Sequence, residues 1–411
     1  MQRRTINQQC LLAVMLFIIC PALSFSVILY HASRRRYWAY TMLAVFMGLC
    51  AMLWPPTGDL YRHTMDYFEF RELNVREFSY YMEMRGESRF DFLLPLLSFL
   101  FAKAGIPFEF VRFLFIFIAY MLAFRVFEDC IRKNPGIGNG RTGIAVFFIF
   151  FLSIQFFTIV MGLRFGFAVI LLAYGAWQYL EEKKLFGLLF IALSCMVHFS
   201  VIPVAMLLFL ARFGVRINNF WIALLCVGAV LCLNTAVFQR VIDILPVSDA
   251  EKMVMSFYVS GYWNGEFLED HSLKFQIAKY LSFLMAFPLM YFAFRNKSDR
   301  PFCSFVRLLI PVVFICYAVS VTMFFRIGLL FVPMGTFLFF SGSTGCTSSR
   351  IRLLLICACL SFASLVYAFR REAAISHEYM LFYPAPVGFS STFSGQWIDR
   401  HIYDNGDFRH K

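Results

Sequence analysis

A group of polar side chains lies where a long apolar run ends, at the Pro-Pro pair of residues 55 and 56. Asp59, Tyr61 and Arg62 follow directly, at the start of a segment over residues 54–90 that is rich in Asp, Glu, Arg and Tyr. A carboxylate there can act as general base on a sugar hydroxyl when its surroundings raise its pKa toward the working pH. The neighbouring Tyr and Arg supply the hydrogen-bonding groups that carbohydrate binding uses. The same residues also suit a solvated loop with a turn at Pro-Thr-Gly-Asp, so both interpretations stay open.

A more specific signal is Arg164, which stands between two long apolar runs with no acidic residue near it in the sequence. An arginine inside a membrane is costly, so it marks a functional site unless its side chain extends to the lipid headgroups. Its planar guanidinium suits bidentate binding of a phosphate. Gly162 and Gly166, on either side, allow a ligand or another helix to approach closely.

Arg326 and His198 extend this pattern. Arg326 also lies between two apolar runs, and His198 lies near the middle of the apolar run 185–211. Two cations on one side of the membrane, together with a histidine that donates a hydrogen bond or carries a proton, suit a doubly charged group such as a pyrophosphate. The alternatives are an arginine that reaches the headgroups and a histidine that only bonds a neighbouring helix. No HxxxH or HxxE pattern and no nucleotide fingerprint is present, so neither a metal nor a cofactor is expected.

A second polar and aromatic segment, residues 239–274, contains Tyr258. It suits a cap over a sugar site, with Tyr258 as a substrate-binding residue, and it equally suits a solvated loop. The last segment, residues 371–411, is aromatic and rich in Pro and Gly but carries no recognisable motif.

Composition defines the class of protein that holds these residues. Of the 411 residues 60% are hydrophobic and only 15% are charged, and the mean hydropathy is +0.69. A polytopic α-helical membrane protein fits these values, whereas long apolar runs exclude an outer-membrane barrel of alternating strands. The net charge of +12 is first a signal of membrane orientation, and no nucleic-acid partner is expected.

Runs long enough to cross a membrane, which takes about 20 residues, are 11–30, 38–54, 108–128, 142–160, 164–180, 219–238, 275–294, 303–323, 326–341 and 352–369. The run 91–103 is too short and is expected to be interfacial or re-entrant, and 185–211 is expected to form two short arms that meet near His198. The run 11–30 is treated as a helix of the mature protein that either crosses or turns back at Pro21. The fold expected is therefore all-α, with about 11–13 transmembrane or re-entrant helices in one domain, 1–370, before the tail.

Lys and Arg clusters predict the orientation, because they gather in cytoplasmic loops. The clusters are Arg34-Arg35-Arg36, Arg132/Lys133/Arg141, Lys183-Lys184, Arg212/Arg216, Arg295/Lys297/Arg300 and Arg350/Arg352. With all of them inside, the loops 54–90 and 239–274, the turns at Arg164 and Arg326, the bend at His198 and the tail face outward. Polar groups on one side favour an enzyme over a carrier, and no internal repeat of the transporter kind is visible.

In this order, Gly58-Asp59, the lone Arg164 followed by small residues through Ala168, the basic turn Lys183-Lys184, His198-Phe199-Ser200 and Arg326 resemble the EpsG family of polysaccharide polymerases. That family is related to the Wzy-type polymerases of O-antigen and capsule repeat units. The resemblance covers about residues 57–330, which is most of the chain.

The resemblance implies a multi-spanning (GT-C-like) glycosyltransferase of the bacterial inner membrane that uses a lipid-linked donor. It moves the growing glycan from undecaprenyl pyrophosphate onto the non-reducing end of another lipid-linked repeat unit at the periplasmic face. Its partners are then that lipid-linked glycan, membrane lipid, and a chain-length regulator and a flippase of the same pathway. The residues assigned to catalysis are Asp59, His198 and Arg164, and those assigned to substrate binding are Arg326, Arg62, Tyr61 and Tyr258.

Two other functions remain open at this point. A membrane O-acyltransferase acting on surface glycans also uses a histidine and arginines among many helices, and the early pair Arg62-His63 keeps it in view. A polysaccharide or lipid transporter would need polar groups reachable from both sides of the membrane.

Overall fold

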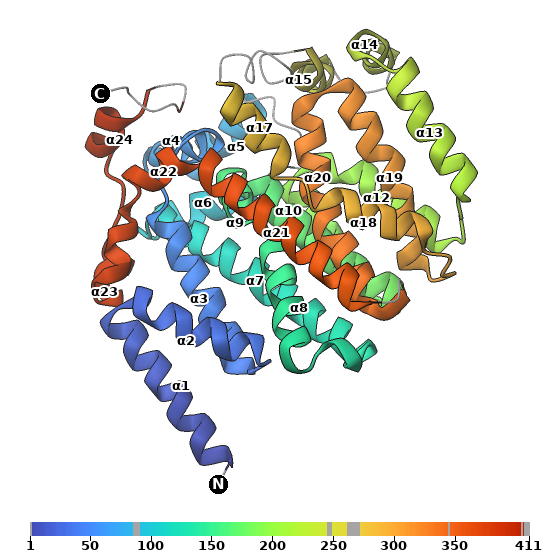
Figure 1. Cartoon of the computed structure of the whole chain (residues 1–411). Coiled ribbons are helices and arrows are strands. Elements are labelled where there is room, and N and C mark those ends of the chain that lie inside the picture. The colour runs from blue at the N-terminus through green and yellow to red at the C-terminus, as the bar shows by residue number, and fades with distance from the viewer. Residues whose placement is uncertain are drawn as a thin grey trace.

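The structure, a computed structural model, describes residues 2–84, 91–244, 249–260, 272–343, 346–403 and residue 406. Over these residues the chain forms a bundle of helices with no strand (Figure 1). The expectation of an all-α polytopic membrane protein is therefore confirmed.

Long apolar helices form the centre of the bundle. Within the described residues, seven are long and apolar enough to cross a membrane, and several of them are interrupted. They are α7 (Phe108–Lys133), α8 with α9 (Gly140–Ser153, Phe156–Met161), α10 with the π-helix η2 (Leu163–Ala176, Trp177–Glu181), α17 with α18 (Leu273–Leu281, Ala286–Arg295), α19 (Pro301–Val319), α20 with η4 (Val321–Leu338, Phe339–Ser343) and α21 (Ser348–Ala368).

Shorter apolar helices pack beside the long ones: α1 (Gln2–Ile19), α2 (Pro21–Ser33), α3 (Tyr37–Leu53), α6 (Leu93–Lys103), α11 (Gly187–Val197) and α12 (Ile202–Arg212). The most extensive packing joins α3 to α7, α10 to α11 and α19 to α20. Glycines permit the close approach of α10 and α11, because a Cβ on Gly175 would lie 2.8 Å from the carbonyl oxygen of Gly187.

The long run 185–211 is divided as predicted. α11 ends at Val197, His198 takes an extended conformation, and the 3₁₀ turn η3 (Phe199–Val201) leads into α12. Pro203 lies in the first turn of α12, where its missing N–H costs no intrahelical hydrogen bond. His198 therefore lies at the junction of two short arms.

Two other runs are broken in the structure. The run 11–30 breaks at Cys20, which is extended, and α2 begins with Pro21 and packs on α1, so the chain follows the alternative of a turn at Pro21. The run 219–238, which was expected to span the membrane, is divided into two helices. That segment forms α13 (Asn219–Cys232) and α14 (Thr235–Ile244), which are bent by 101°.

The turn before Arg326 also differs from the prediction. It was expected at Arg326 itself, but α19 ends at Val319 and α20 begins at Val321. Ser320 is extended, and its side chain accepts a hydrogen bond from the N–H of Met323, which caps α20. Arg326 consequently lies within α20, about one and a half turns from its start.

The segments expected to face outward are also largely helical. They form α4 (Asp59–Glu72), α5 (Val75–Met84), α15 (Asp249–Ser260), and in the tail α22 (Arg370–Ile375), the 3₁₀ helix η5 (His377–Phe382), α23 (Ala385–Ser390) and α24 (Gly395–His401). In Figure 1, α4, α5, α15 and α22 lie at the upper end, away from the N-terminus. Tyr258 belongs to α15, but its side chain lies outside the described part of the chain.

Candidate active site

Arg164 occupies the first turn of α10, next to a tight hairpin. α9 ends at Met161, Gly162 precedes α10, and a Cβ on Gly166 would lie 2.6 Å from the Cα of Ile159. The prediction of a close approach at Gly166 is confirmed, with α9 as the neighbour. A cation at a helix N-terminus adds to the positive end of the dipole and to the unpaired N–H groups there. The start of α10 is therefore suited to an anion.

Asp91 links three parts of this region. Its Oδ2 lies 3.8 Å from Nη1 of Arg164, and both side chains are buried. Its Oδ1 accepts a hydrogen bond of 2.6 Å from the backbone N–H of Phe199. The carboxylate of Asp91, which lies just before α6, thus holds both Arg164 and the turn that follows His198.

His198 lies at this turn with its imidazole fixed. Its Nδ1 accepts a hydrogen bond of 3.2 Å from the backbone N–H of Ser200, and Oγ of the same serine lies at 2.9 Å. With Nδ1 as acceptor, the proton of the neutral ring is on Nε2, which is then a donor. The ring also meets the ring of Phe165 edge-on, at 5.4 Å between centroids.

Arg326, from α20, also contacts Phe165. Its guanidinium carbon lies 5.5 Å from the centroid of that ring, in a cation–π contact. The charges of Arg326, Arg164, Asp59 and His63 all act on the imidazole of His198. The structure therefore brings Asp59, Arg164, His198 and Arg326, which were selected from the sequence, into one cluster.

α4 contributes a buried histidine between two carboxylates. Nε2 of His63 lies 3.6 Å from Asp59 and Nδ1 lies 3.6 Å from Asp66. The three residues are four and three positions apart, so they share one face of the helix. The hydroxyl of Tyr81 donates a hydrogen bond of 3.0 Å to Asp66.

These contacts fix the charges on α4. Burial alone would raise the pKa of Asp59, but His63, Arg164 and Arg62 outweigh it and hold that pKa well below its usual range. Burial and Arg164 alone would lower the pKa of His63, but the carboxylates of Asp59 and Asp66 outweigh them and raise it. Asp59 is thus an anion beside a histidine that holds its proton more firmly than usual.

The tail holds α4 in place from the opposite face. Tyr61 packs with Phe393, Ile398 and Ile402 of the tail, on a face of α4 apart from His63. Gly58, whose φ of 56° favours glycine, donates its N–H to the carbonyl of Gly406. Of the other residues assigned to substrate, Arg62 is exposed and bonds Asp59, and the side chain of Tyr258 is outside the described part.

A second clamp fixes the end of α3, from which α4 follows. The fully buried Arg112 donates to the carbonyls of Met52 (3.1 Å) and Trp54 (2.7 Å). Its partner Glu109, at 3.3 Å, accepts a hydrogen bond of 3.0 Å from the N–H of Phe393. These bonds satisfy carbonyls that the helix end leaves without intrahelical partners.

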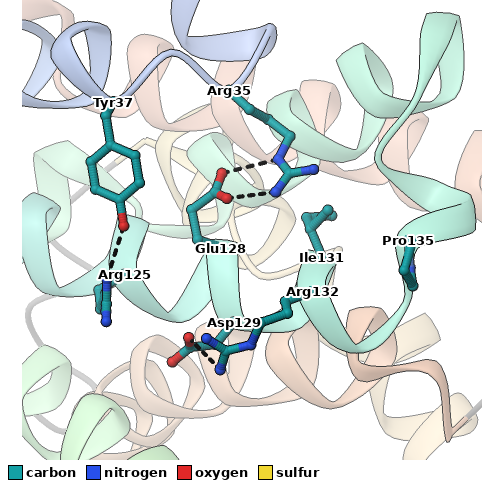
Figure 2. Close-up of a pocket in the computed structure, with 8 residues that line it drawn as sticks. All are labelled: Arg35, Tyr37, Arg125, Glu128, Asp129, Ile131, Arg132 and Pro135. Atoms are coloured by element: carbon teal, nitrogen blue, oxygen red, sulfur yellow. Dashed lines mark hydrogen bonds and ion pairs between the residues drawn. The ribbon is translucent and has the colours of Figure 1, made fainter.

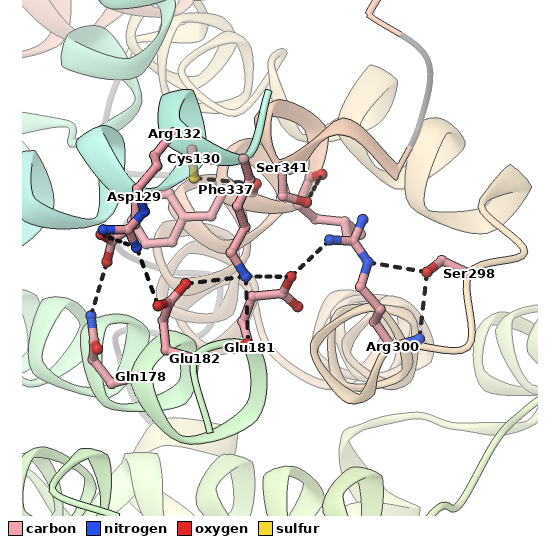
Figure 3. A network of polar contacts seen from close by, with 12 residues as sticks. Asp129, Cys130, Arg132, Gln178, Glu181, Glu182, Ser298, Arg300, Phe337 and Ser341 are labelled. Carbon is pink, nitrogen blue, oxygen red and sulfur yellow. Dashed lines mark hydrogen bonds and ion pairs between the residues drawn. The ribbon is translucent and has the colours of Figure 1, made fainter. Parts of the chain in front are cut away.

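The other end of α10 and η2 carries a different charged cluster (Figure 3). Glu181 pairs with Lys133 at 2.9 Å and Arg300 at 2.7 Å, and Glu182 pairs with Arg132 at 3.2 Å. The 19 residues from Leu163 to Glu181 cover roughly 28 Å at about 1.5 Å per residue. That length is close to the hydrocarbon thickness of about 30 Å, so the two clusters lie at opposite ends of a helix long enough to cross a membrane.

The fold and the buried cluster at the start of α10 define a polytopic α-helical membrane protein with a charged site at one end of a membrane-spanning helix. The profile of the EpsG family matches residues 36–384, which is most of the chain. The chain belongs to the EpsG family, as the sequence motifs predicted, and this membership indicates a polysaccharide polymerase-like role. Neither the curated proteins nor the solved structures compared with the chain give a match.

Proposed function

We propose that the protein polymerises lipid-linked oligosaccharide repeat units. It transfers the growing glycan from undecaprenyl pyrophosphate to the non-reducing end of an acceptor repeat unit at the periplasmic face. The observation that carries this proposal is the convergence of Arg164, Arg326 and His198 beside Asp59. As the bond between sugar and pyrophosphate breaks, negative charge grows on the leaving group, and preorganised cations at that position lower the barrier.

Each side chain has a role in this reaction. Arg164 and the N–H groups at the start of α10 bind one phosphate, Arg326 binds the other, and Nε2 of His198 donates a hydrogen bond to the leaving oxygen. Asp59 accepts a hydrogen bond from the acceptor hydroxyl and orients it. Its low pKa makes it a weak base. A weak base is sufficient when the bond from sugar to pyrophosphate breaks before the acceptor hydroxyl loses its proton, as in an oxocarbenium-like transition state.

The two ends of α10 support the orientation. The cluster at Glu181 and Glu182 contains Arg132, Lys133 and Arg300, which belong to the Lys and Arg clusters expected in cytoplasmic loops. Lys and Arg concentrate on the cytoplasmic side, so that end of α10 is inside and Arg164 is near the outer boundary. A lipid-linked donor presents its pyrophosphate at that depth.

Complementation of a deletion strain tests the proposal. Without the gene, lipid-linked single repeat units accumulate and long polymer is absent. At normal expression Arg164→Ala leaves this state unchanged, and Arg164→Lys recovers only a small part, because lysine keeps the charge but lacks the planar fork. Arg352→Ala, at an exposed position of α21, restores polymer and serves as control. Full polymer from Arg164→Ala would refute the assignment.

Acyl transfer to a surface glycan is a second candidate, favoured by His63 between two carboxylates. A histidine in such a setting is a common acid–base group. The same strains distinguish the two functions. Loss of an acyltransferase leaves polymer of normal length without its ester-linked acyl groups, whereas loss of a polymerase leaves single repeat units.

A further inference from the structure

A polar cavity of about 380 Å³ lies at the C-terminal end of α7 (Figure 2). It adjoins the charged cluster of Arg132 and Glu182, at the end of the bundle opposite the candidate active site. The start of α3 and the last turns of α7 form it. Its polar lining comprises three arginines, two acids and a tyrosine: Arg35, Arg125, Arg132, Glu128, Asp129 and Tyr37. Its volume falls within the range of small-molecule sites, about 300–1,000 Å³.

Both acids of the cavity are already committed to partners. Glu128 accepts two hydrogen bonds from Arg35, at 3.1 and 2.6 Å, and a third from the hydroxyl of Tyr40 at 2.6 Å. Asp129 pairs with Arg132 at 2.9 Å and accepts from Gln178 at 3.2 Å. The negative charges in the lining are therefore neutralised within the protein.

Arg125 is the cation in excess. Its Nη1 donates a hydrogen bond of 2.8 Å to the hydroxyl of Tyr37, which is a neutral partner. The residue is exposed, and its guanidinium fork suits two phosphate oxygens. Three arginines against two acids leave the lining with one net positive charge.

The backbone holds Arg35 over this cavity in an unusual conformation. Its φ of 60° is left-handed, a conformation that is unfavourable for a residue other than glycine. The bidentate bond to Glu128 holds the side chain in that position. Arg35 and Glu128 therefore form a fixed wall of the cavity, beside the exposed Arg125.

Aromatic residues place the cavity at the membrane–water boundary. Tyr30 and Tyr37 are exposed at this end, with Trp38 beside them. Tyr and Trp concentrate at the level of the headgroups. Basic pockets between membrane helices at this depth are suited to anionic headgroups.

We propose that this cavity binds a phosphate group through Arg125 and Tyr37. The headgroup of an anionic phospholipid and free phosphate share this chemistry, and both can reach the cavity, one from the bilayer and one from the aqueous phase. Phosphatidylcholine carries the same phosphate, but its choline cation is repelled by the net positive lining. The proposal is independent of the reaction at the other membrane boundary.

Native mass spectrometry of the purified, delipidated full chain tests the lipid source. Phosphatidylglycerol is titrated against phosphatidylcholine, which is zwitterionic. We expect Arg125→Gln to weaken phosphatidylglycerol binding about tenfold, the effect of one charge-assisted hydrogen-bonded contact. Arg352→Gln, a change of the same kind at an exposed position of α21, alters it less than about twofold.

Calorimetry with inorganic phosphate, on protein held in phosphatidylcholine nanodiscs, tests the soluble source. Phosphate binding that is lost in Arg125→Gln supports the site with a soluble ligand. Arg125→Lys keeps the charge and is the control for a folding defect. The Tm of each variant shows whether the protein is still folded. Equal binding of both lipids and no phosphate binding, or equal losses in Arg125→Gln and Arg352→Gln, would overturn the proposal.

Discussion

The carboxylate of Asp91 lies 3.8 Å from the guanidinium of Arg164, and both side chains are buried. A buried ion pair adds little net stability. Removal of one partner is strongly destabilising, however, because the other charge is then buried without compensation. Since the same carboxylate bonds the N–H of Phe199, it sets Arg164 and the turn at His198 relative to each other.

Asp91→Asn and Asp91→Ala separate these two effects. Asparagine still accepts the bond from Phe199 but loses the charge. We therefore expect a folded protein whose polymer output falls by about 10–100-fold, as for a misplaced catalytic group. Both variants leave the charge of Arg164 uncompensated, which lowers the free energy of unfolding by about 3–5 kcal/mol. Alanine also leaves the N–H of Phe199 unpaired, which costs about 1–3 kcal/mol more. Polymer length distributions and thermal unfolding in detergent provide the measurements, and wild-type output from Asp91→Asn would contradict the idea.

The stability of α4 should depend on pH through His63. Its pKa is raised in the folded state, so the stabilisation is fully present below the ordinary value of 6.5 and is lost as the pH rises through the folded-state pKa. The pKa of Asp59 is lowered, so its contribution is present above the ordinary value of 3.8 and is lost as the pH falls through the folded-state pKa. Between these limits the charged pair is intact.

We therefore expect the Tm of the wild-type protein to be steady from about pH 5 to 6.5 and to fall above that range. The His63→Gln variant should lack this fall, whereas His401→Gln, in α24, should retain it. Thermal unfolding in detergent over a pH series provides the test. Parallel curves for the wild type and His63→Gln would show that the carboxylates do not hold a proton on this residue.

Hydropathy and isolated charges predicted much of this arrangement. An arginine or histidine in an apolar run is conspicuous, so Arg164, His198 and Arg326 were found from sequence, and the structure brings them together. His63 was considered from the sequence only with Arg62 for acyl transfer, and neither it nor Asp66 was assigned to the polymerase site, because the segment 54–90 was interpreted as a loop. His63 lies four residues after Asp59 and Asp66 lies three residues after His63, a spacing that becomes meaningful only on a helix.

Other features depend on tertiary contacts that no local pattern contains. Asp91 is one acid in a polar segment, and its role arises from α10 and the turn at Phe199. The break between α19 and α20 depends on capping by Ser320, six residues before the arginine that marked the expected turn. The tail has no motif because its function in the fold is packing on α4.

Phe393 tests whether the tail positions α4. Its buried ring stacks on His377 at 4.3 Å and lies 5.5 Å from the guanidinium of Arg112, which holds the end of α3. Phe393→Ala should lower the free energy of unfolding by about 3–5 kcal/mol, as for other buried phenylalanines. Phe393→Leu should cost less than about 1.5 kcal/mol.

Because α4 carries Asp59, Phe393→Ala should also reduce polymer formation, and limited proteolysis should cut the tail sooner. Thermal unfolding, protease time courses and complementation measure the three effects. An unchanged protease pattern together with full activity would mean that the tail is not a support for α4.

The orientation can be tested at two glycines with open space around them. A Cβ on Gly136, in the turn after α7, or on Gly395, at the start of α24, meets no atom within 4 Å, so a cysteine fits at either position. Gly136 adjoins the basic cluster of Arg132 and Lys133, and Gly395 belongs to the tail that packs on α4. The positive-inside rule therefore puts the first in the cytoplasm and the second outside.

In a background with the exposed Cys232 and Cys359 replaced by serine, a membrane-impermeant maleimide should label Gly395→Cys in intact spheroplasts. Gly136→Cys should react only after permeabilisation, and the parent without either new cysteine corrects for the remaining native thiols. The reverse pattern would place Arg164 and His198 at the cytoplasmic boundary. A donor whose pyrophosphate is presented on the outer side would then be out of reach, because about 30 Å of hydrocarbon separates the two boundaries.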